Sequence, residues 1–465
     1  MSSAHAHDPY AHVGALSGTH AHVSAFRKLA WLALAALASC VPSSQELRAP
    51  VDRLVADRIG APADGDNLSA AEIDRLLTQP LNAAAAVRIA LAQNPRLHAA
   101  FDALDIAGGD VASALGIGPV SIEAKARFGV SHDEYELDAI QSVLGLLAAP
   151  GRRAAAGAEL AAARADAAAT ALRIATRVEI AFDDLLAAQQ DIALRQTAFD
   201  AADAGATLRE RMHAAGNTTD LALARDRDAR EQARIELARA TAAAETRHET
   251  VTALLGLSGD QTKWTAAGAL RDLPAAPPTL DALEATAAAA SLELVAGRDR
   301  RDAAAHRAQT ERLQAFLPQL GLGVAIAADP NETGIGPAIQ IGLPVFDQRA
   351  GERARANAAV RRADHELAAE AVELGAAARA ARVTALATYQ EARRLHDVVL
   401  PLRRQIVDET LAHYNAMDAD PFALIVARRE LAEGAHAYVD ATRRYWNAMA
   451  EVTALSRGIM LEEPR

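Results

Sequence analysis

Few residues of this chain have the types and the spacing that a catalytic or metal-binding site requires. His132-Asp133-Glu134 are residue types that hold metals or transfer protons, yet between two candidate strands they are typical of a solvated turn. Asp226 and Asp228, in the run ARDRDARE, are typical of a charged helix face. The sequence contains no HExxH, phosphate-binding loop, GxSxG or CxxC motif. It therefore predicts no enzyme: no catalytic residue, no metal site and no cofactor.

The residues before the single cysteine, Cys40, predict that this cysteine is chemically modified. Arg27-Lys28 precede the apolar run Leu29–Ser39, which is the pattern of a secretory signal peptide. Leu37-Ala38-Ser39-Cys40 resembles the lipobox of bacterial lipoproteins, which implies cleavage before Cys40 and acylation by chains such as palmitate. Val41, where an aspartate would favour retention, favours the outer membrane. The alternative is an ordinary signal peptide with a chance cysteine. Five of the fourteen histidines lie upstream in residues 1–25, where removal is favoured over metal binding.

The composition favours helices that pack closely through small side chains. Hydrophobic residues make up 51% of the 465 residues but aromatic residues only 4%, and alanine accounts for the difference. The net charge is -12, with acidic and basic residues mixed along the helical stretches. Because no basic block or stripe stands out, a nucleic-acid partner is not expected.

Helical patterns cover most of the chain and follow one plan twice. Before them, Val41–Gln79 is expected to be a tether with weak periodicity. The expected helices are Leu81–Ala114 with a break or kink at Asn94-Pro95, Pro150 to about His213, and Leu221–Leu255 in the first half, then Leu280–Leu313, Arg349–Asn415 and a last helix from Pro421 in the second. The two turning points, Ala215–Asp220 and Ala416–Pro421, carry helix-capping residues.

The last helix has the clearest heptad pattern. Two seams recur seven residues apart, one of large and one of small side chains, which favours close helix approach in a coiled coil. The large seam is Leu424, Leu431, Tyr438, Tyr445 and Val452, and the small seam is Ala427, Gly434, Ala441, Ala448 and Leu455.

Each half also contains a candidate strand pair. The pairs are Val120–Val130 with Tyr135–Leu144, and Leu317–Ala328 with Gly336–Phe346. In the first strand apolar residues alternate with Glu123, Lys125 and Arg127. In a membrane barrel such alternation faces lipid on one side and a wet lumen on the other, but a half-buried soluble hairpin gives the same pattern.

Several segments together resemble the outer-membrane factor family of the TolC type. The strongest is Gly342-Leu343-Pro344-Val345-Phe346-Asp347, where a strand pair ends before a long helix; its signature residues are Gly342, Pro344, Phe346 and Asp347. Ala86–Leu97 resembles the start of the family's first repeat, and His213–Leu257 its first helical hairpin. The resemblance covers about Leu81–Leu455. It divides the chain into 1–39 (N-terminal extension and lipoprotein signal peptide), 40–80 (lipid anchor and tether), and two helix-strand-strand-helix-helix repeats, 81–270 and 271–465.

The resemblance implies a mainly α fold with a membrane β-barrel. Long antiparallel coiled-coil helices would form an α-barrel. Four strands per protomer are too few to close a barrel, but three copies would give twelve. The implied function is a passive, trimeric outer-membrane efflux channel, with a periplasmic helical extension, that joins a periplasmic adaptor and an inner-membrane pump. Ser142–Arg153 and Leu411–Tyr414 resemble members often associated with metal efflux more than with drug efflux. Metal ions or toxic small molecules are therefore the expected cargo. The alternative is a periplasmic coiled-coil structural lipoprotein without a barrel.

The two helical tips correspond to the family's adaptor-facing and gate-forming end. The tip residues expected to face an adaptor are Gly216, Asn217, Asp220, Met417, Asp418 and Asp420. In some members two aspartates ring the closed aperture, but those positions fall here on Ala423 and Val426, and a polar bridge at the first tip is lost at Ala222. The gate is therefore expected to rest on Asp418, Asp420 or apolar residues such as Phe422; the alternative is a gate that closes less tightly.

Overall fold

The computed structural model describes residues 42–60, 68–116, 120–128, 133–316, 319–328, 332–342 and 349–461. Contacts divide the chain into two units, Met1–Ser43 and Ser44–Arg465. The first unit, with Cys40 and the predicted signal peptide, lies almost entirely outside the described residues. Pro344, Phe346 and Asp347 of the predicted signature also lie outside them. The description that follows concerns the second unit.

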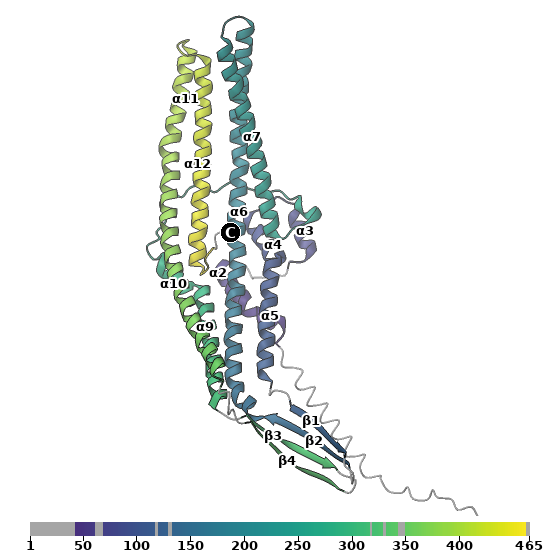
Figure 1. Cartoon of the computed structure of the whole chain (residues 1–465). Helices are drawn as coiled ribbons and strands as arrows, with labels where there is room; N and C mark the ends of the chain where they lie inside the picture. The colour runs from purple at the N-terminus through teal and green to yellow at the C-terminus, as the bar shows by residue number, and fades with distance from the viewer. Residues whose placement is uncertain are drawn as a thin grey trace, which may run out of the picture. The chain divides into compact units, whose positions relative to one another are not determined.

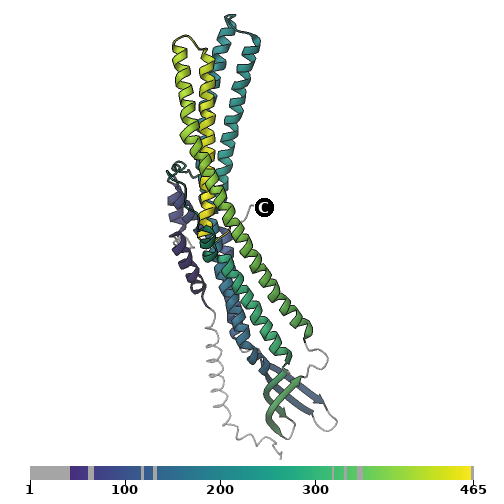
Figure 2. The same ribbon diagram turned by 90° about the vertical axis from the view of Figure 1, so that its left-hand side faces the viewer.

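Long helices and one four-stranded sheet make up this unit (Figure 1). Before the first strand the helices are α2 (Ser44–Ile59), α3 (Ala70–Leu77), α4 (Ala83–Gln93) and α5 (Pro95–Leu115). After the first strand pair come α6 (Val143–Ala214), α7 (Asp220–Leu255), the 3-10 turn η2 (Gly259–Thr262), α8 (Leu283–Ala290) and α9 (Leu292–Phe316). After the second pair come α10 (Ala350–Arg394), the π-helical turn η3 (Leu395–Val399), α11 (Leu400–Asn415) and α12 (Pro421–Ser456). The hairpins α6–α7 and α11–α12 extend to the end of the unit opposite the sheet (Figures 1 and 2).

Helix α6 begins earlier than the sequence predicts. It starts at Val143, where the Ser142 hydroxyl accepts a hydrogen bond from the Gly145 N–H at 3.2 Å, rather than at Pro150. Pro150 lies inside the helix rather than at its start. The next residue, Gly151, lies where α6 packs against α9. A Cβ on Gly151 would lie 2.2 Å from the Thr310 hydroxyl of α9. The 72 residues of α6 span about 110 Å at about 1.5 Å per residue.

The segment predicted to be a tether contains two helices, α2 and α3. Three side chains of α2 at i, i+4 and i+8 (Leu47, Val51 and Val55) are buried in the main core. Helix α3 begins with a capping box between Ser69 and Glu72. The sequence analysis predicts no helix here because Pro50 lies inside this short apolar stripe.

A similar helix junction occurs in each of the two predicted repeats. In the first, Asn94 separates α4 from α5, caps α5 through the Arg96 N–H, and donates to the Leu254 carbonyl at 2.8 Å. In the second, the predicted single helix Leu280–Leu313 is in fact interrupted at Ser291, whose hydroxyl accepts from the Leu294 N–H at 3.1 Å.

A left-handed glycine closes each of these junctions. Gly256 ends α7 at φ 73°, and a Cβ there would lie 2.7 Å from the Gln93 carbonyl. Gly458 follows α12 at φ 82°, and a Cβ there would lie 1.9 Å from the Ala290 carbonyl. Both sites need glycine for its backbone conformation and for the close approach of a neighbouring chain.

Helix α6 is the central packing element. It contacts α2, α4, α5, α7, α9 and α12, and its buried residues are mostly alanine, so neighbouring backbones approach closely. On α12 the predicted small seam is fully buried (Ala427, Gly434, Ala441, Ala448 and Leu455). Of the large seam, Tyr445 and Val452 are buried and the other three residues are half-buried. The heptad prediction therefore identifies the buried face of α12.

The strands form one antiparallel sheet in the order β1-β2-β3-β4. Their bounds are β1 Val120–Phe128, β2 Asp133–Ser142, β3 Gln319–Ala328 and β4 Thr333–Gly342. Both second strands begin earlier than predicted. β2 also ends earlier, because Val143 and Leu144 belong to α6, and the last four residues of the predicted strand Gly336–Phe346 lie outside the described ranges. Pro337 is compatible with β4 because β4 is an edge strand of this sheet.

Candidate functional site

The sheet has one continuous apolar face. In an antiparallel sheet, residues directly opposite each other point to the same side. The register therefore places isoleucine, leucine and valine side chains of all four strands together. Opposed pairs on this face are Ile122 with Ala139, Leu137 with Ile326, and Leu322 with Ile339. These side chains do not pack into a core: Ile122 is 71% exposed, Ile335 74% and Ile339 65%. An exposed apolar face of this extent indicates a membrane or protein contact.

The opposite face of the sheet is polar, as the alternation in β1 predicts. The Lys125 ammonium lies 3.0 Å from the Asp138 carboxylate, 3.7 Å from Glu123 and 3.8 Å from Glu136. Arg127 pairs with Glu134 at 3.7 Å. On β3 and β4 the same face carries glycine, alanine and Gln340. On this face the pair β1–β2 is therefore charged, whereas the pair β3–β4 is uncharged and has mostly small side chains.

The first helical tip is a tight turn with complete backbone capping. Gly216 has φ 75°, and the Asn217 N–H donates to the Met212 carbonyl at 2.8 Å. The Thr219 hydroxyl accepts from the Ala222 N–H and begins α7. The His213 ring lies 2.6 Å from the Asp220 carboxylate and joins the two helices of the hairpin.

The second tip repeats this arrangement with different residues. Met417 takes the left-handed position at φ 62° and is 96% exposed. The Asp418 N–H donates to the His413 carbonyl at 2.9 Å, while its carboxylate lies 2.9 Å from the His413 ring. Asp420 caps α12 through the Phe422 N–H at 2.9 Å, and Pro421 is the first helical residue, as predicted.

Arg209 joins the two tips, and sequence reasoning missed it. Its guanidinium lies over the Phe422 ring at 3.3 Å from the centroid and 2.5 Å from the Asp226 carboxylate. It also donates to the Thr218 hydroxyl at 3.2 Å. Asp226, which the sequence placed on a charged helix face, is instead a half-buried partner of this contact. No short-range pattern connects Arg209 to Phe422, because they belong to different repeats.

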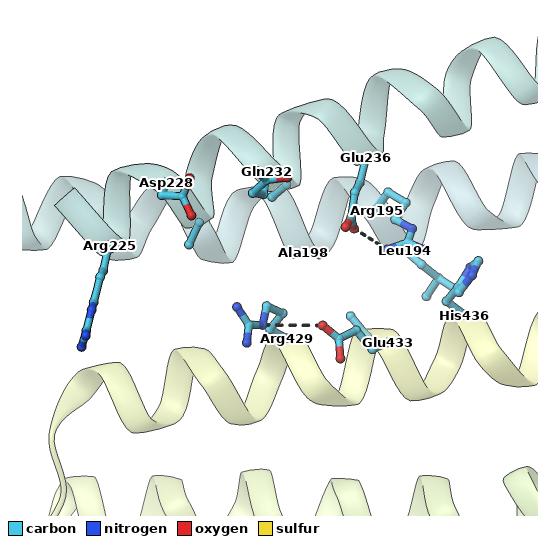
Figure 3. Close-up of a pocket in the computed structure, with 13 residues that line it drawn as sticks. Leu194, Arg195, Ala198, Arg225, Asp228, Gln232, Glu236, Arg429, Glu433 and His436 are labelled. Atoms are coloured by element: carbon cyan, nitrogen blue, oxygen red, sulfur yellow. Dashed lines mark hydrogen bonds and ion pairs between the residues drawn. The ribbon is translucent and has the colours of Figure 1, made fainter. Parts of the chain in front are cut away.

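A groove of about 320 Å³ separates the first hairpin from α12 (Figure 3). Polar side chains from three helices line it, most of them charged: Arg195 of α6, Arg225, Asp228 and Glu236 of α7, and Arg429, Glu433 and His436 of α12. Arg195 pairs with Glu236 across the first hairpin at 2.6 Å. At one end, the His436 ring lies 2.5 Å from the Asp191 carboxylate of α6 and so bridges the two hairpins.

Further polar contacts attach α12 to the first repeat nearer the sheet. Arg443 and Asn447 both donate to the Asp184 carboxylate, at 3.0 and 2.9 Å. Arg271 donates to Asp183 at 2.6 Å and lies over the Trp446 ring. Burial raises the pKa of the Asp183 carboxyl above its ordinary value, and the hydrogen bond from Arg271 opposes this rise. These contacts bind the repeats together and show no arrangement suited to catalysis.

The predicted tip residues lie where the sequence placed them, at the ends of the two hairpins. Gly216, Asn217 and Asp220 form the first turn, and Met417, Asp418 and Asp420 the second. Phe422 is half-buried beneath Arg209, whereas Asp418 and Asp420 are exposed. Ala423 and Val426, at the family's gate positions, are exposed on α12. Gly342, the one signature residue in the described ranges, ends β4 opposite Gln319.

None of the helices in the described ranges has the length and apolar character of a membrane span. Within those ranges, histidine, cysteine, aspartate and glutamate side chains also form no group of three or more that could hold a metal ion.

This architecture is shared with several solved structures of bacterial membrane proteins. VceC of Vibrio cholerae superposes with a TM-score of 0.67 at 20% identity, over 85% of this chain and 100% of VceC. The Campylobacter jejuni CmeC outer membrane channel gives a TM-score of 0.70 at 14% identity, over 82% of this chain and 87% of CmeC. A membrane protein from Pseudomonas aeruginosa superposes with a TM-score of 0.69 at 16% identity, over 86% of this chain and 94% of that protein. No family model and no curated protein matches the sequence. The predicted fold, long antiparallel helices with four antiparallel strands, is therefore confirmed.

Proposed function

We propose that this chain is the outer-membrane channel of a tripartite efflux system and works as a homotrimer. The sheet is the observation that carries the proposal. It combines an exposed apolar face, a polar opposite face and two unpaired edge strands at one end of long helices. An open sheet edge is not tolerated in the hydrocarbon of a membrane. Three copies, each pairing its β4 edge with the β1 edge of the next, would close a twelve-stranded barrel around a wet lumen.

In this proposal the helices continue the duct into the periplasm and the two tips meet the adaptor. The tips are capped turns with exposed carboxylates, and the groove of about 320 Å³ between the hairpins adds a further charged surface. Asp418, Asp420 and Phe422 stay the gate candidates. Cys40 would hold the acyl anchor in the outer membrane. The inner-membrane pump supplies the energy, and the channel performs no chemistry. Metal ions or toxic small molecules are the proposed cargo.

The native mass of the detergent-extracted mature protein tests the assembly and the anchor together. We expect three copies, each beginning at Cys40 and carrying added acyl mass. A single copy without acyl mass would remove the barrel, since four strands cannot close one.

Protease accessibility in intact outer membranes separates the channel from a periplasmic structural lipoprotein. A channel protects residues 120–142 and 319–342 in lipid, apart from the turns that connect the strands. Cleavage within the strands themselves by a periplasmic protease would favour the structural lipoprotein.

A further inference from the structure

We propose that the charged wall formed by β1 and β2 gives the membrane section of the lumen a preference for cations over anions. This inference rests on the proposed trimeric channel, because it requires that the polar face of the sheet lines water. The exposed isoleucines of the other face support that orientation, since an apolar face is favoured toward lipid.

The charged wall has more carboxylates than cations. Its charged side chains, all on one face by register, are Glu123, Lys125 and Arg127 of β1 and Glu134, Glu136 and Asp138 of β2. Four carboxylates against two cations leave a net charge of -2 in each copy.

The second strand pair does not compensate this charge. On the same face β3 contributes Gly321, Gly323, Ala325 and Ala327, and β4 contributes Gly334, Gly336, Ala338 and Gln340. A Cβ on Gly323 would lie 1.9 Å from the Ala139 carbonyl, so the backbone itself forms this part of the wall. In a trimer the lumen would therefore alternate between three acidic sectors and three neutral ones.

The positive charges of the wall are held among carboxylates. Lys125 is within 4 Å of Glu123, Glu136 and Asp138 together, so its charge is locally neutralised. Arg127 has Glu134 as its directly opposed partner at 3.7 Å. An ion in the lumen therefore experiences mainly the unbalanced carboxylates.

The salt concentration sets the distance over which the carboxylates of the wall attract a cation. The Debye length is about 10 Å at 0.1 M salt and about 3 Å at 1 M. We expect a cation preference at 0.1 M that is largely lost at 1 M. Three charges about 10 Å from a passing ion, one per copy, change its local concentration about twofold at the lower salt.

The opposed pair Arg127 and Glu134 provides a matched test. Arg127→Gln makes the wall more acidic and Glu134→Gln makes it less acidic, yet both substitutions break the same ion pair between the same two backbone positions. Both side chains are largely exposed, so neither change leaves a buried charge. The measurement is the reversal potential of the purified trimer in a planar bilayer under a KCl gradient.

We expect the K⁺ to Cl⁻ permeability ratio to exceed one in the unmodified protein. Arg127→Gln should raise this ratio and Glu134→Gln should lower it, each about two- to fourfold at 0.1 M salt. The double variant restores the net charge and should return to the starting ratio. Equal shifts in one direction, or no shift, would overturn the inference while leaving the channel intact. A trimer that does not conduct at all would instead refute the proposed function.

Discussion

The exposed apolar face of the sheet predicts a large cost for a charge at Ile339. This residue lies near the middle of β4, opposite Leu322, and is 65% exposed. An arginine on the lipid face near the bilayer midplane costs about 2–4 kcal/mol. That cost corresponds to a reduction of about 30- to 700-fold in the equilibrium constant for folding of each copy. Because the proposed trimer carries three copies, its assembly should be strongly impaired.

Gln340→Arg is the matched control for Ile339→Arg. It introduces the same side chain one residue later, on the polar face, and should leave stability nearly unchanged. The assay is urea unfolding after reconstitution into lipid vesicles, together with the amount of trimer in outer membranes. Equal stability of the two variants would refute the assignment of the apolar face to lipid. A more damaging Gln340→Arg would show that the faces are reversed.

Two further predictions concern positions where packing is tight. Gly323→Ala should reduce the yield of folded trimer, because the new Cβ would collide with the Ala139 carbonyl. Gly336→Ala is the control and should not reduce the yield, because a Cβ there meets no atom within 4 Å. Equal yields of the two variants would contradict the strand register. Arg209→Gln should speed hydrogen exchange at the start of α12 about fivefold, since a cation–π contact contributes about 1 kcal/mol. Arg227→Gln, which removes a pair between α7 and α6 only, is its control, and an equal effect there would exclude Arg209 as a link between the hairpins.

Local patterns were enough to predict the plan of this chain. The heptads of α12 identify its buried seam, because alanine and glycine at seven-residue intervals can be satisfied only by a neighbouring helix. Asn94-Pro95 marks a true helix break, since proline suits the first position of a new helix and asparagine caps it. The sequence likewise predicts the two helical tips, from Gly216 at the first and from Asp420 and Pro421 at the second.

Tertiary contacts decide what the sequence left open. Pro150 was expected to begin a helix, but the Ser142 cap and the packing of α6 against α9 extend the helix past it. Helix α2 is stable because three side chains of a short stripe fill the core. The contact of Arg209 with Phe422 joins residues more than two hundred positions apart, so no window of sequence contains it.

The open, two-sided sheet also constrains how the protein can be made. A single copy presents exposed isoleucines and the two edge strands of its four-stranded sheet to water, a combination that promotes aggregation. In the proposed trimer each copy gains stability by pairing with two others, so its maturation depends on its own concentration. Overproduction in a compartment without a membrane to enter should therefore yield aggregates rather than a pool of soluble subunits.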